Sequence, residues 1–203
     1  MSDTLPVHLV DDDAGVAEAC RYLLEGLALE VTYWPDGETF LSAADLQSPA
    51  AVILDMRMPG LDGAEVQQRL VAADACLGVI ILTGHGDVDM AVEAMKRGAV
   101  DFLQKPVDAA SLQQALVSAF ARARDCAAGN RLLARARTLS ERETDIAALV
   151  SEGLTNREIA EALHIAVRTV EVHRARVVEK MGAANSAELA ALWQRLDTVR
   201  RSG

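Results

Sequence analysis

Residues 51–55, AVILD, form an apolar run that ends in a carboxylate, and residues 9–13, LVDDD, end a second apolar run in three carboxylates. A lone acidic group at the end of a buried strand favours its neutral form, so several acidic groups that converge there indicate a bound cation. Two more apolar runs lead directly to Thr83 and to Lys105. In an open parallel sheet, ligands bind at the carboxyl ends of the strands. The pattern therefore predicts that carboxylates, a hydroxyl and an ammonium group meet at one edge of a sheet.

These residue types suit the binding of a phosphoryl group. A divalent ion and Lys105 would neutralise phosphoryl oxygens, Thr83 would donate a hydrogen bond to one of them, and Asp55 has the nucleophilic carboxylate. A simpler interpretation is that residues 11–13 only begin a helix, because aspartate is a good N-cap and suits the first helical turn. That interpretation is sufficient for Asp13. It leaves the polar groups at the other three strand ends unexplained, so we predict an aspartyl phosphorylation site.

Strand-like runs alternate with amphipathic helical patterns through the first 125 residues. Helical i, i+3, i+4 spacing is clear, for example, in Val88, Ala91, Val92 and Met95. Such alternation predicts a parallel sheet covered by helices on both faces. The strand-like runs lie at residues 7–10, 31–34, 51–54, 79–82 and 102–103.

Charge divides the chain of 203 residues in two. Residues 1–125 have 20 acidic and 8 basic side chains, a balance of −12, whereas residues 126–203 have 10 acidic and 12 basic side chains, a balance of +2. The length allows either one large domain or two small ones. The asymmetry favours two domains and makes the second half the candidate for binding a polyanion.

The sequence shows neither a signal-like start nor an apolar run long enough to span a bilayer. We therefore expect a cytoplasmic protein that has no membrane contact. Its three cysteines are odd in number and lack metal-ligand spacing, which favours free thiols in a reducing compartment. They are Cys20, Cys76 and Cys126.

The first half resembles the receiver domain of two-component response regulators, over about residues 7–124. The matching strings are LVDDD, ILDMRMPGLDG, ILTGHGD and GAVDFLQKP, in the order that the family has them. The resemblance implies an α/β, flavodoxin-like (βα)5 fold with strand order 2-1-3-4-5. It assigns Asp55 as the phosphoacceptor and implies Mg²⁺ on Asp12, Asp55 and the backbone carbonyl of Arg57, with Asp11 in support.

Two further features fit such a site. Gly84 and Gly86 would let the backbone approach the phosphoryl group. The bond between Lys105 and Pro106 is a candidate cis peptide, which the resemblance supports.

The resemblance also implies a switch at Thr83 and Phe102. Thr83 would be drawn toward the phosphoryl group, and the ring of Phe102 would turn into the space that it leaves. On its position alone, Phe102 has one alternative interpretation, a static core aromatic. We expect the repacked surface of helix 4, strand 5 and helix 5, near residues 88–97 and 101–103, to form a homodimer on phosphorylation.

A long helical pattern begins after Asp108. Gly129 and Asn130 are expected to weaken or end this helix, leaving a basic connector at residues 131–137. We place the receiver at residues 1–124, a helical and basic linker at 125–137, and a second domain at 138–203.

Four helices are predicted in the second domain. Capping boxes, in which Ser140 pairs with Glu143 and Thr155 with Glu158, mark the starts of the first two. Ala166, directly before the third helix, has no side chain that could cap it. The four helices are expected at residues 141–152, 156–163, 167–181 and 186–196.

This all-α segment resembles the LuxR-type helix-turn-helix, and TNREIAEAL and RTVEVHR are its most specific stretches. With the receiver first, the chain looks most like the FixJ branch of the FixJ/NarL response regulators. The resemblance implies that the third helix faces base edges in the major groove through Glu171, Val172 and Ala175. We expect phosphate contacts from Arg168, Thr169, Arg174, Arg176 and Lys180, with Thr155 and Asn156 near the preceding helix. His173 could touch a phosphate or pack within the domain.

The predicted function is a phosphorylation-activated, DNA-binding transcriptional regulator. A sensor histidine kinase would phosphorylate Asp55, the homodimer would bind paired promoter half-sites, and RNA polymerase is a further expected partner. Kinase choice is expected to depend on exposed positions of the first helix, such as Ala14, Ala17, Glu18 and Arg21.

Two other functions are weighed against this one. The first is a constitutive DNA-binding protein whose receiver is not used. The second is a phosphatase or phosphotransferase with an aspartyl-phosphate intermediate. Haloacid-dehalogenase-like enzymes of that kind place an aspartate two residues after the nucleophile, where this chain has Arg57. We therefore expect slow self-dephosphorylation and no stand-alone catalysis.

Overall fold

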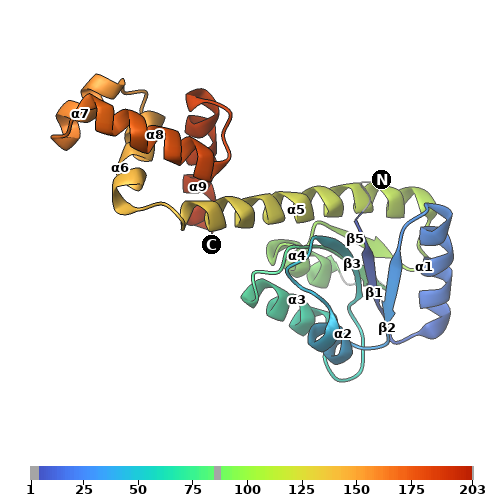
Figure 1. Cartoon of the computed structure of the whole chain (residues 1–203). Coiled ribbons are helices and arrows are strands. Elements are labelled where there is room, and N and C mark those ends of the chain that lie inside the picture. Colours follow the sequence, from blue (N-terminus) through green and yellow to red (C-terminus); the bar gives the residue numbers. More distant parts are fainter. Residues whose placement is uncertain (1–4, 85–87, 203) are drawn as a thin grey trace. The chain divides into compact units, whose positions relative to one another are not determined.

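The protein was examined as a computed structural model that describes residues 5–84 and 88–202, without the side chains of residues 88, 89 and 202 (Figure 1). Gly86 lies outside the described residues. The chain divides into two compact units, Met1–Ala127 and Ala128–Gly203. None of the helices in the described part of the chain has the length and hydropathy needed to cross a bilayer.

The first unit contains a five-stranded parallel sheet in the order β2-β1-β3-β4-β5, which confirms the predicted flavodoxin-like order. All six residues of the central strand β3 are buried, as expected for a strand with helices on both faces. The strands are β1 (Val7–Val10), β2 (Val31–Trp34), β3 (Ala50–Asp55), β4 (Leu77–Thr83) and β5 (Asp101–Gln104).

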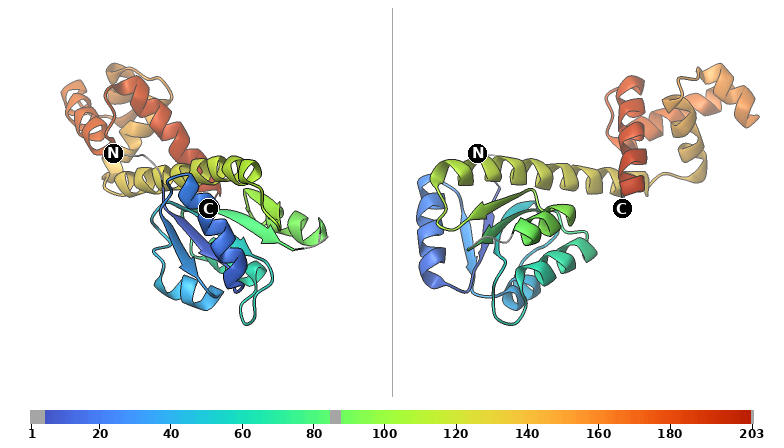
Figure 2. Two further views of the ribbon diagram at one scale, coloured as in Figure 1. Left: turned by 90° about the vertical axis from the view of Figure 1, so that its right-hand side faces the viewer. Right: turned by 180° about the vertical axis from the view of Figure 1, so that it is seen from behind.

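Helices cover both faces of this sheet (Figures 1 and 2). The helices α1 (Ala14–Gly26) and α5 (Ala109–Ala136) pack on one face, where Leu24 and Leu112 are fully buried. The opposite face is covered by α2, α3 and α4, and its core includes Phe40 and Val66. These three helices span Gly37–Ala43, Gly63–Ala72 and Val88–Lys96.

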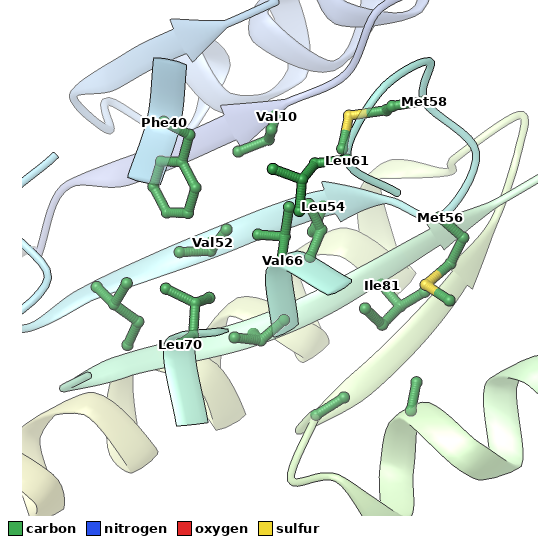
Figure 3. Packing of buried hydrophobic residues seen from close by; sticks show 14 of the residues in the cluster. Val10, Phe40, Val52, Leu54, Met56, Met58, Leu61, Val66, Leu70 and Ile81 are labelled. Atoms are coloured by element: carbon green, nitrogen blue, oxygen red, sulfur yellow. The ribbon is translucent and has the colours of Figure 1, made fainter. Parts of the chain in front are cut away.

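The loop after β3 is held against the sheet by apolar side chains (Figure 3). Met56, Met58 and Leu61 are buried in the core that Val66 of α3 also enters, whereas Arg57 is exposed. The loop therefore has a fixed path immediately after Asp55.

The helix α5 is longer than predicted. It continues through Gly129 and Asn130 to Ala136, so the prediction that these two residues end it is wrong. A glycine costs about 1 kcal/mol in a helix interior. Packing offsets this cost here, because Leu132 and Ala136 are buried in the core of the second unit.

The second unit consists of the end of α5 and four further helices, which enclose a core around Ile146, Ile159, Val177 and Trp193. Both predicted capping boxes are present, at Ser140 and at Thr155. The helices are α6 (Glu141–Ser151), α7 (Asn156–Leu163), α8 (Val167–Met181) and α9 (Ser186–Ser202).

Two sequence-based expectations about individual side chains are wrong. Cys76 and Cys126 form a disulfide, so only Cys20 of the three cysteines is a free thiol. Spacing along the chain could not reveal this pair, because 50 residues separate the two cysteines. Ala17, expected to be exposed on the first helix, is buried against the sheet. Ala14, Glu18 and Arg21 are exposed.

Candidate functional site

The three consecutive aspartates after β1 have three different environments. Asp11 is fully buried, and its carboxylate accepts a hydrogen bond from the backbone N–H of Asp13 at 2.9 Å. Asp13 caps α1 by accepting hydrogen bonds from the N–H groups of Gly15 and Val16. Asp12 is exposed. The simpler interpretation, an N-cap, therefore applies to Asp13 alone.

Asp11, Asp12 and Asp55 form a compact carboxylate cluster at the carboxyl ends of β1 and β3. One oxygen from each lies within 4.8 Å of the others. Lys105, directly after β5, joins the cluster, because its Nζ donates to Oδ2 of Asp11 at 2.7 Å and to Oδ2 of Asp55 at 2.8 Å. The Lys105–Pro106 peptide bond is cis, as predicted.

Burial and charge act against one another in this cluster. Burial raises the pKa of the Asp11 carboxyl, although the hydrogen bonds from Lys105 and from the Asp13 backbone act in the other direction. Burial also acts to lower the pKa of Lys105. The hydrogen bonds and negative charges of Asp11 and Asp55 outweigh it, so the pKa of this ammonium group is raised.

The donor set fits a hard divalent cation. Mg²⁺ prefers carboxylate, carbonyl and water oxygens, and the three carboxylates supply such oxygens within one small volume. Together with the Lys105 ammonium they leave a net negative charge, which a divalent ion would compensate.

Backbone contacts position Asp55 closely. The backbone N–H of Arg57 donates to Oδ1 of Asp55 at 3.3 Å, so the Arg57 backbone lies beside this carboxylate. The Arg57 side chain is exposed. A Cβ added at Gly63 would overlap the Asp55 carbonyl and the Met56 backbone. Gly63 therefore lets α3 begin directly against the end of β3.

The two predicted switch residues lie near this cluster on β4 and β5. The carbonyl of Thr83 accepts a hydrogen bond from the backbone N–H of Lys105 at 2.8 Å. Phe102 is 48 % exposed, so the ring is not the static core aromatic that was the alternative. It borders an open cavity of about 480 Å³ between β5 and α5, which Lys105 and Ser111 also line.

In the second unit, α8 has one buried and one exposed face. Val170, Val177 and Met181 are buried. The exposed side chains recur with helical spacing, which gives a continuous stripe of the kind that enters a DNA groove. They are Val167, Arg168, Thr169, Glu171, Val172, Ala175, Arg176, Glu179 and Lys180. As predicted, Ala166 provides no side-chain cap to this helix.

Several predicted DNA contacts are already engaged within the unit. Arg174 donates to Asn156 Oδ1 at 2.6 Å and to Ser186 Oγ at 3.2 Å. Lys180 donates to Glu143 Oε2 at 2.6 Å and to the Thr138 carbonyl at 3.0 Å.

Three further predicted contacts differ in how they are placed. Arg168 forms an exposed ion pair with Glu171 at 3.0 Å. Nδ1 of His173 is buried and has no hydrogen-bond partner among the residues that the structure describes. Thr155 is exposed and hydrogen-bonds Glu158 in the capping box of α7.

Sequence reasoning missed two residues of interest. Tyr33, at the end of β2, donates its hydroxyl to the Asp11 carbonyl at 3.0 Å. Glu143 was recognised only as half of a capping box, yet its buried carboxylate also binds Lys180 of α8. Both contacts join distant parts of the sequence, so no local pattern indicates them.

Comparisons with known proteins match both halves of the chain. Residues 7–117 match the family described as response regulator receiver domain, and residues 137–193 match bacterial regulatory proteins of the luxR family. The tetrathionate response regulatory protein TtrR of Salmonella typhimurium is 50 % identical over 94 % of this chain and 92 % of its own length. The transcriptional regulatory protein FixJ of Azorhizobium caulinodans is 42 % identical over 95 % of this chain and 93 % of its own length.

Solved structures agree over the whole length. The response regulator StyR has a TM-score of 0.72 and 34 % identity, covering 95 % of this chain and 99 % of its own. Full-length FixJ from B. japonicum has a TM-score of 0.58 and 38 % identity, covering 97 % and 99 %. Both named relatives are regulatory proteins, and FixJ is named as a regulator of transcription. The chain therefore belongs to the FixJ/NarL family of two-component response regulators, with a receiver domain followed by a LuxR-type DNA-binding domain.

Proposed function

We propose that this transcriptional regulator is switched on by phosphorylation of Asp55 by a partner sensor histidine kinase. The observation that carries the proposal is the convergence of Asp11, Asp12, Asp55 and Lys105 at one edge of the sheet. An Asp55 oxygen would attack the phosphorus of the phosphohistidine, and the histidine nitrogen would leave. Lys105 would then exchange its contact with Asp55 for a phosphoryl oxygen, stabilising charge that develops during transfer.

Mg²⁺ bound at this cluster would neutralise the phosphoryl oxygens during transfer. Asp12, Asp55 and the backbone carbonyl of Arg57 would hold the ion, with Asp11 in support. Asp11 keeps Lys105 in place through its 2.7 Å hydrogen bond.

The signal would leave the site through the ends of β4 and β5. The new phosphoryl group adds negative charge and strong acceptor oxygens, to which the Thr83 hydroxyl would donate. The exposed Phe102 ring borders a cavity, which gives it room to turn inward as Thr83 moves. The surface of α4, β5 and α5 would change shape as a result.

This surface has the composition of a dimer interface. Val92 and Met95 of α4 and Phe102 of β5 are large apolar side chains that are 41–48 % exposed. Covering apolar side chains of that exposure with a partner lowers the free energy of the complex. The phosphorylated homodimer would present two copies of α8 to paired promoter half-sites in the cytoplasm, where it would also contact RNA polymerase.

The test uses full-length protein, Mg²⁺ and acetyl phosphate. Intact mass should rise by one phosphoryl group in the wild type and in Asp74→Asn, which changes an exposed aspartate after α3, and should not rise in Asp55→Asn. Binding to DNA selected by the protein from a random pool should strengthen only in the two proteins that gain mass. If the wild type gained no mass, or bound DNA no better after gaining it, the protein would be a constitutive DNA binder with an unused receiver.

A second measurement addresses the dimer. Size-exclusion chromatography with light scattering should show a dimer for phosphorylated wild type and a monomer for Asp55→Asn. The variant Val92→Asp should gain the phosphoryl mass and remain a monomer. A dimer of phosphorylated Val92→Asp would place the interface elsewhere.

A further inference from the structure

The disulfide between Cys76 and Cys126 joins two elements that matter for signal output. Cys76 lies directly before β4 and is fully buried, whereas Cys126 lies in α5 and is half-buried. Their Cα atoms are 5.3 Å apart, within the usual range for bonded cysteines. The Cys126 sulfur is therefore the one that a small reagent could reach first.

Helix packing brings the two cysteines together whether or not they are bonded. A Cβ added at Gly78 would overlap the backbone of Ala119, so β4 and α5 are in backbone contact at this point. Cys126 follows Ala119 by seven residues, or two helical turns, and so lies on the same face of α5. Ala123, between them, is fully buried. Reduction would leave the two thiols as neighbours that can bond again.

Cys126 lies in the part of α5 that leads from the first unit to the second. The boundary between the two units falls after residue 127, and α5 continues through it to Ala136. Leu132 and Ala136 belong to the core of the DNA-binding unit. A bond at Cys126 therefore restrains the helix that covalently joins the receiver to the DNA-binding domain.

We propose that Cys76 and Cys126 are a redox modification site whose substrate is a low-molecular-weight disulfide of the glutathione class. The inference rests on the proposed function, because a DNA-binding regulator works in a reducing compartment, where protein disulfides are transient. Cys20 is not part of the site. It is buried, and burial raises the pKa of its thiol, which lowers the fraction of reactive thiolate.

The reaction is thiol–disulfide exchange in two steps. Cys126 loses its proton and its thiolate attacks one sulfur of the small disulfide, whose S–S bond breaks and releases one thiolate. Cys76 then loses its proton and attacks Sγ of Cys126, forming the protein disulfide and releasing the second small thiolate. The two protons end on the two released thiols. Each cysteine is oxidised by one electron, and the small disulfide is reduced by two.

Thiol counting tests whether the site is modified. Full-length protein is reduced, desalted, equilibrated with a series of reduced to oxidised glutathione ratios, acid-quenched, denatured and alkylated with N-ethylmaleimide. Intact mass should show three adducts in the reducing buffers and one, on Cys20, in the oxidising buffers. Three adducts at every ratio would mean that the pair does not form, and one at every ratio would mean a permanent disulfide; either result would overturn the proposal.

Hydrogen exchange tests the consequence for α5. Backbone amides of residues 120–127 should exchange at least tenfold more slowly in the oxidised than in the reduced wild type. Equal exchange in the two states would overturn the proposed restraint. This comparison uses one protein in two redox states, so it does not depend on how well any variant folds.

Variants assign the effect to the pair. Cys20→Ala is the matched control and should keep the redox-dependent exchange, with two adducts falling to none. Cys126→Ser should lose the redox-dependent difference in hydrogen exchange. A parallel series with Asp55→Asn separates this proposal from the proposed function, because Asp55→Asn should gain no phosphoryl mass and still show the same thiol transition. Loss of that transition in Asp55→Asn would contradict a site that acts independently of phosphorylation.

Discussion

Asp11, Asp12 and Asp13 are chemically identical neighbours, and their contacts alone distinguish them. Asp11 is buried and accepts from Lys105, Asp13 is the N-cap of α1, and Asp12 is exposed with its carboxylate turned toward Asp55. The metal-binding role should therefore fall on Asp12 far more than on Asp13.

Substitution by asparagine separates the two roles. Asp12→Asn removes one of the clustered negative charges, and two unit charges about 4 Å apart interact by roughly 4 kcal/mol near a protein surface. We expect the dissociation constant of Mg²⁺, measured by isothermal titration calorimetry, to rise by at least about tenfold. Asp13→Asn should change it by less than about twofold, because asparagine caps a helix as well as aspartate does. An equal loss of Mg²⁺ affinity in both variants would show that the ion depends on the total charge of residues 11–13 rather than on Asp12.

Among the elements, α6 and α8 are tied together by one buried carboxylate. Glu143 Oε2 accepts from the Ser140 backbone at 2.8 Å and from Lys180 Nζ at 2.6 Å. The Lys180 hydrogen bond, followed by that from Ser140, lowers the pKa of Glu143 from its ordinary value of 4.5 to about 2. One ion pair therefore fixes α8, the helix that is predicted to face the DNA groove, on the start of α6.

This pair should make the stability of the second unit depend on pH. In the unfolded chain Glu143 takes up a proton near pH 4.5, whereas in the folded chain it stays ionised down to about pH 2. The stabilisation is therefore complete above pH 4.5 and is lost as the pH falls toward 2. Lys180→Met keeps the apolar stem and should lower the free energy of unfolding at neutral pH by about 1–3 kcal/mol. The difference from wild type should vanish near pH 2.

Urea unfolding followed by the fluorescence of the buried Trp193, in a Trp34→Phe background, measures this effect. Arg142→Met serves as the control, because Arg142 forms a longer ion pair with the exposed Asp145 at 3.9 Å. A deficit in Lys180→Met that stayed constant from pH 7 to 2 would show that lost packing, rather than the ion pair, caused it.

The elements also show which boundaries the sequence can predict. The bounds of α7 and α8 match the predictions, because a capping box, a turn and the apolar spacing are local signals. The end of α5 was missed, because burial of Leu132 and Ala136 in a distant core outweighs the local cost of Gly129.

The residues of the candidate site could be predicted from the sequence for a similar reason. In a parallel sheet, the strand ends fall at one edge whatever the loops do, so Asp11, Asp55, Thr83 and Lys105 could be placed together from their runs alone. The disulfide and the Glu143–Lys180 pair depend on how helices pack across the fold, and no spacing in the chain encodes them.

On the scale of the whole molecule, a chain of net charge −10 has to bind a polyanion. The receiver half is strongly acidic and the second half only mildly basic, so binding must depend on local cations that face the DNA. Arg176 of α8 is exposed and lies on the stripe that is predicted to face the DNA groove. Lys180 and Arg174 are already hydrogen-bonded inside the unit, which leaves Arg176 as the stronger candidate for a phosphate contact.

Arg176→Ala should therefore weaken binding by a similar factor on all DNA sequences and lower the slope of log affinity against log salt by about 1. Arg21→Ala, which removes the same charge from the exposed face of α1, should leave that slope unchanged. Fluorescence anisotropy of labelled DNA at four salt concentrations measures both slopes. A direct phosphate contact releases a counterion only at the position of the contact, so it should affect the slope in Arg176→Ala alone. An equal fall of the slope in both variants would mean that DNA binding depends on the net charge of the whole chain.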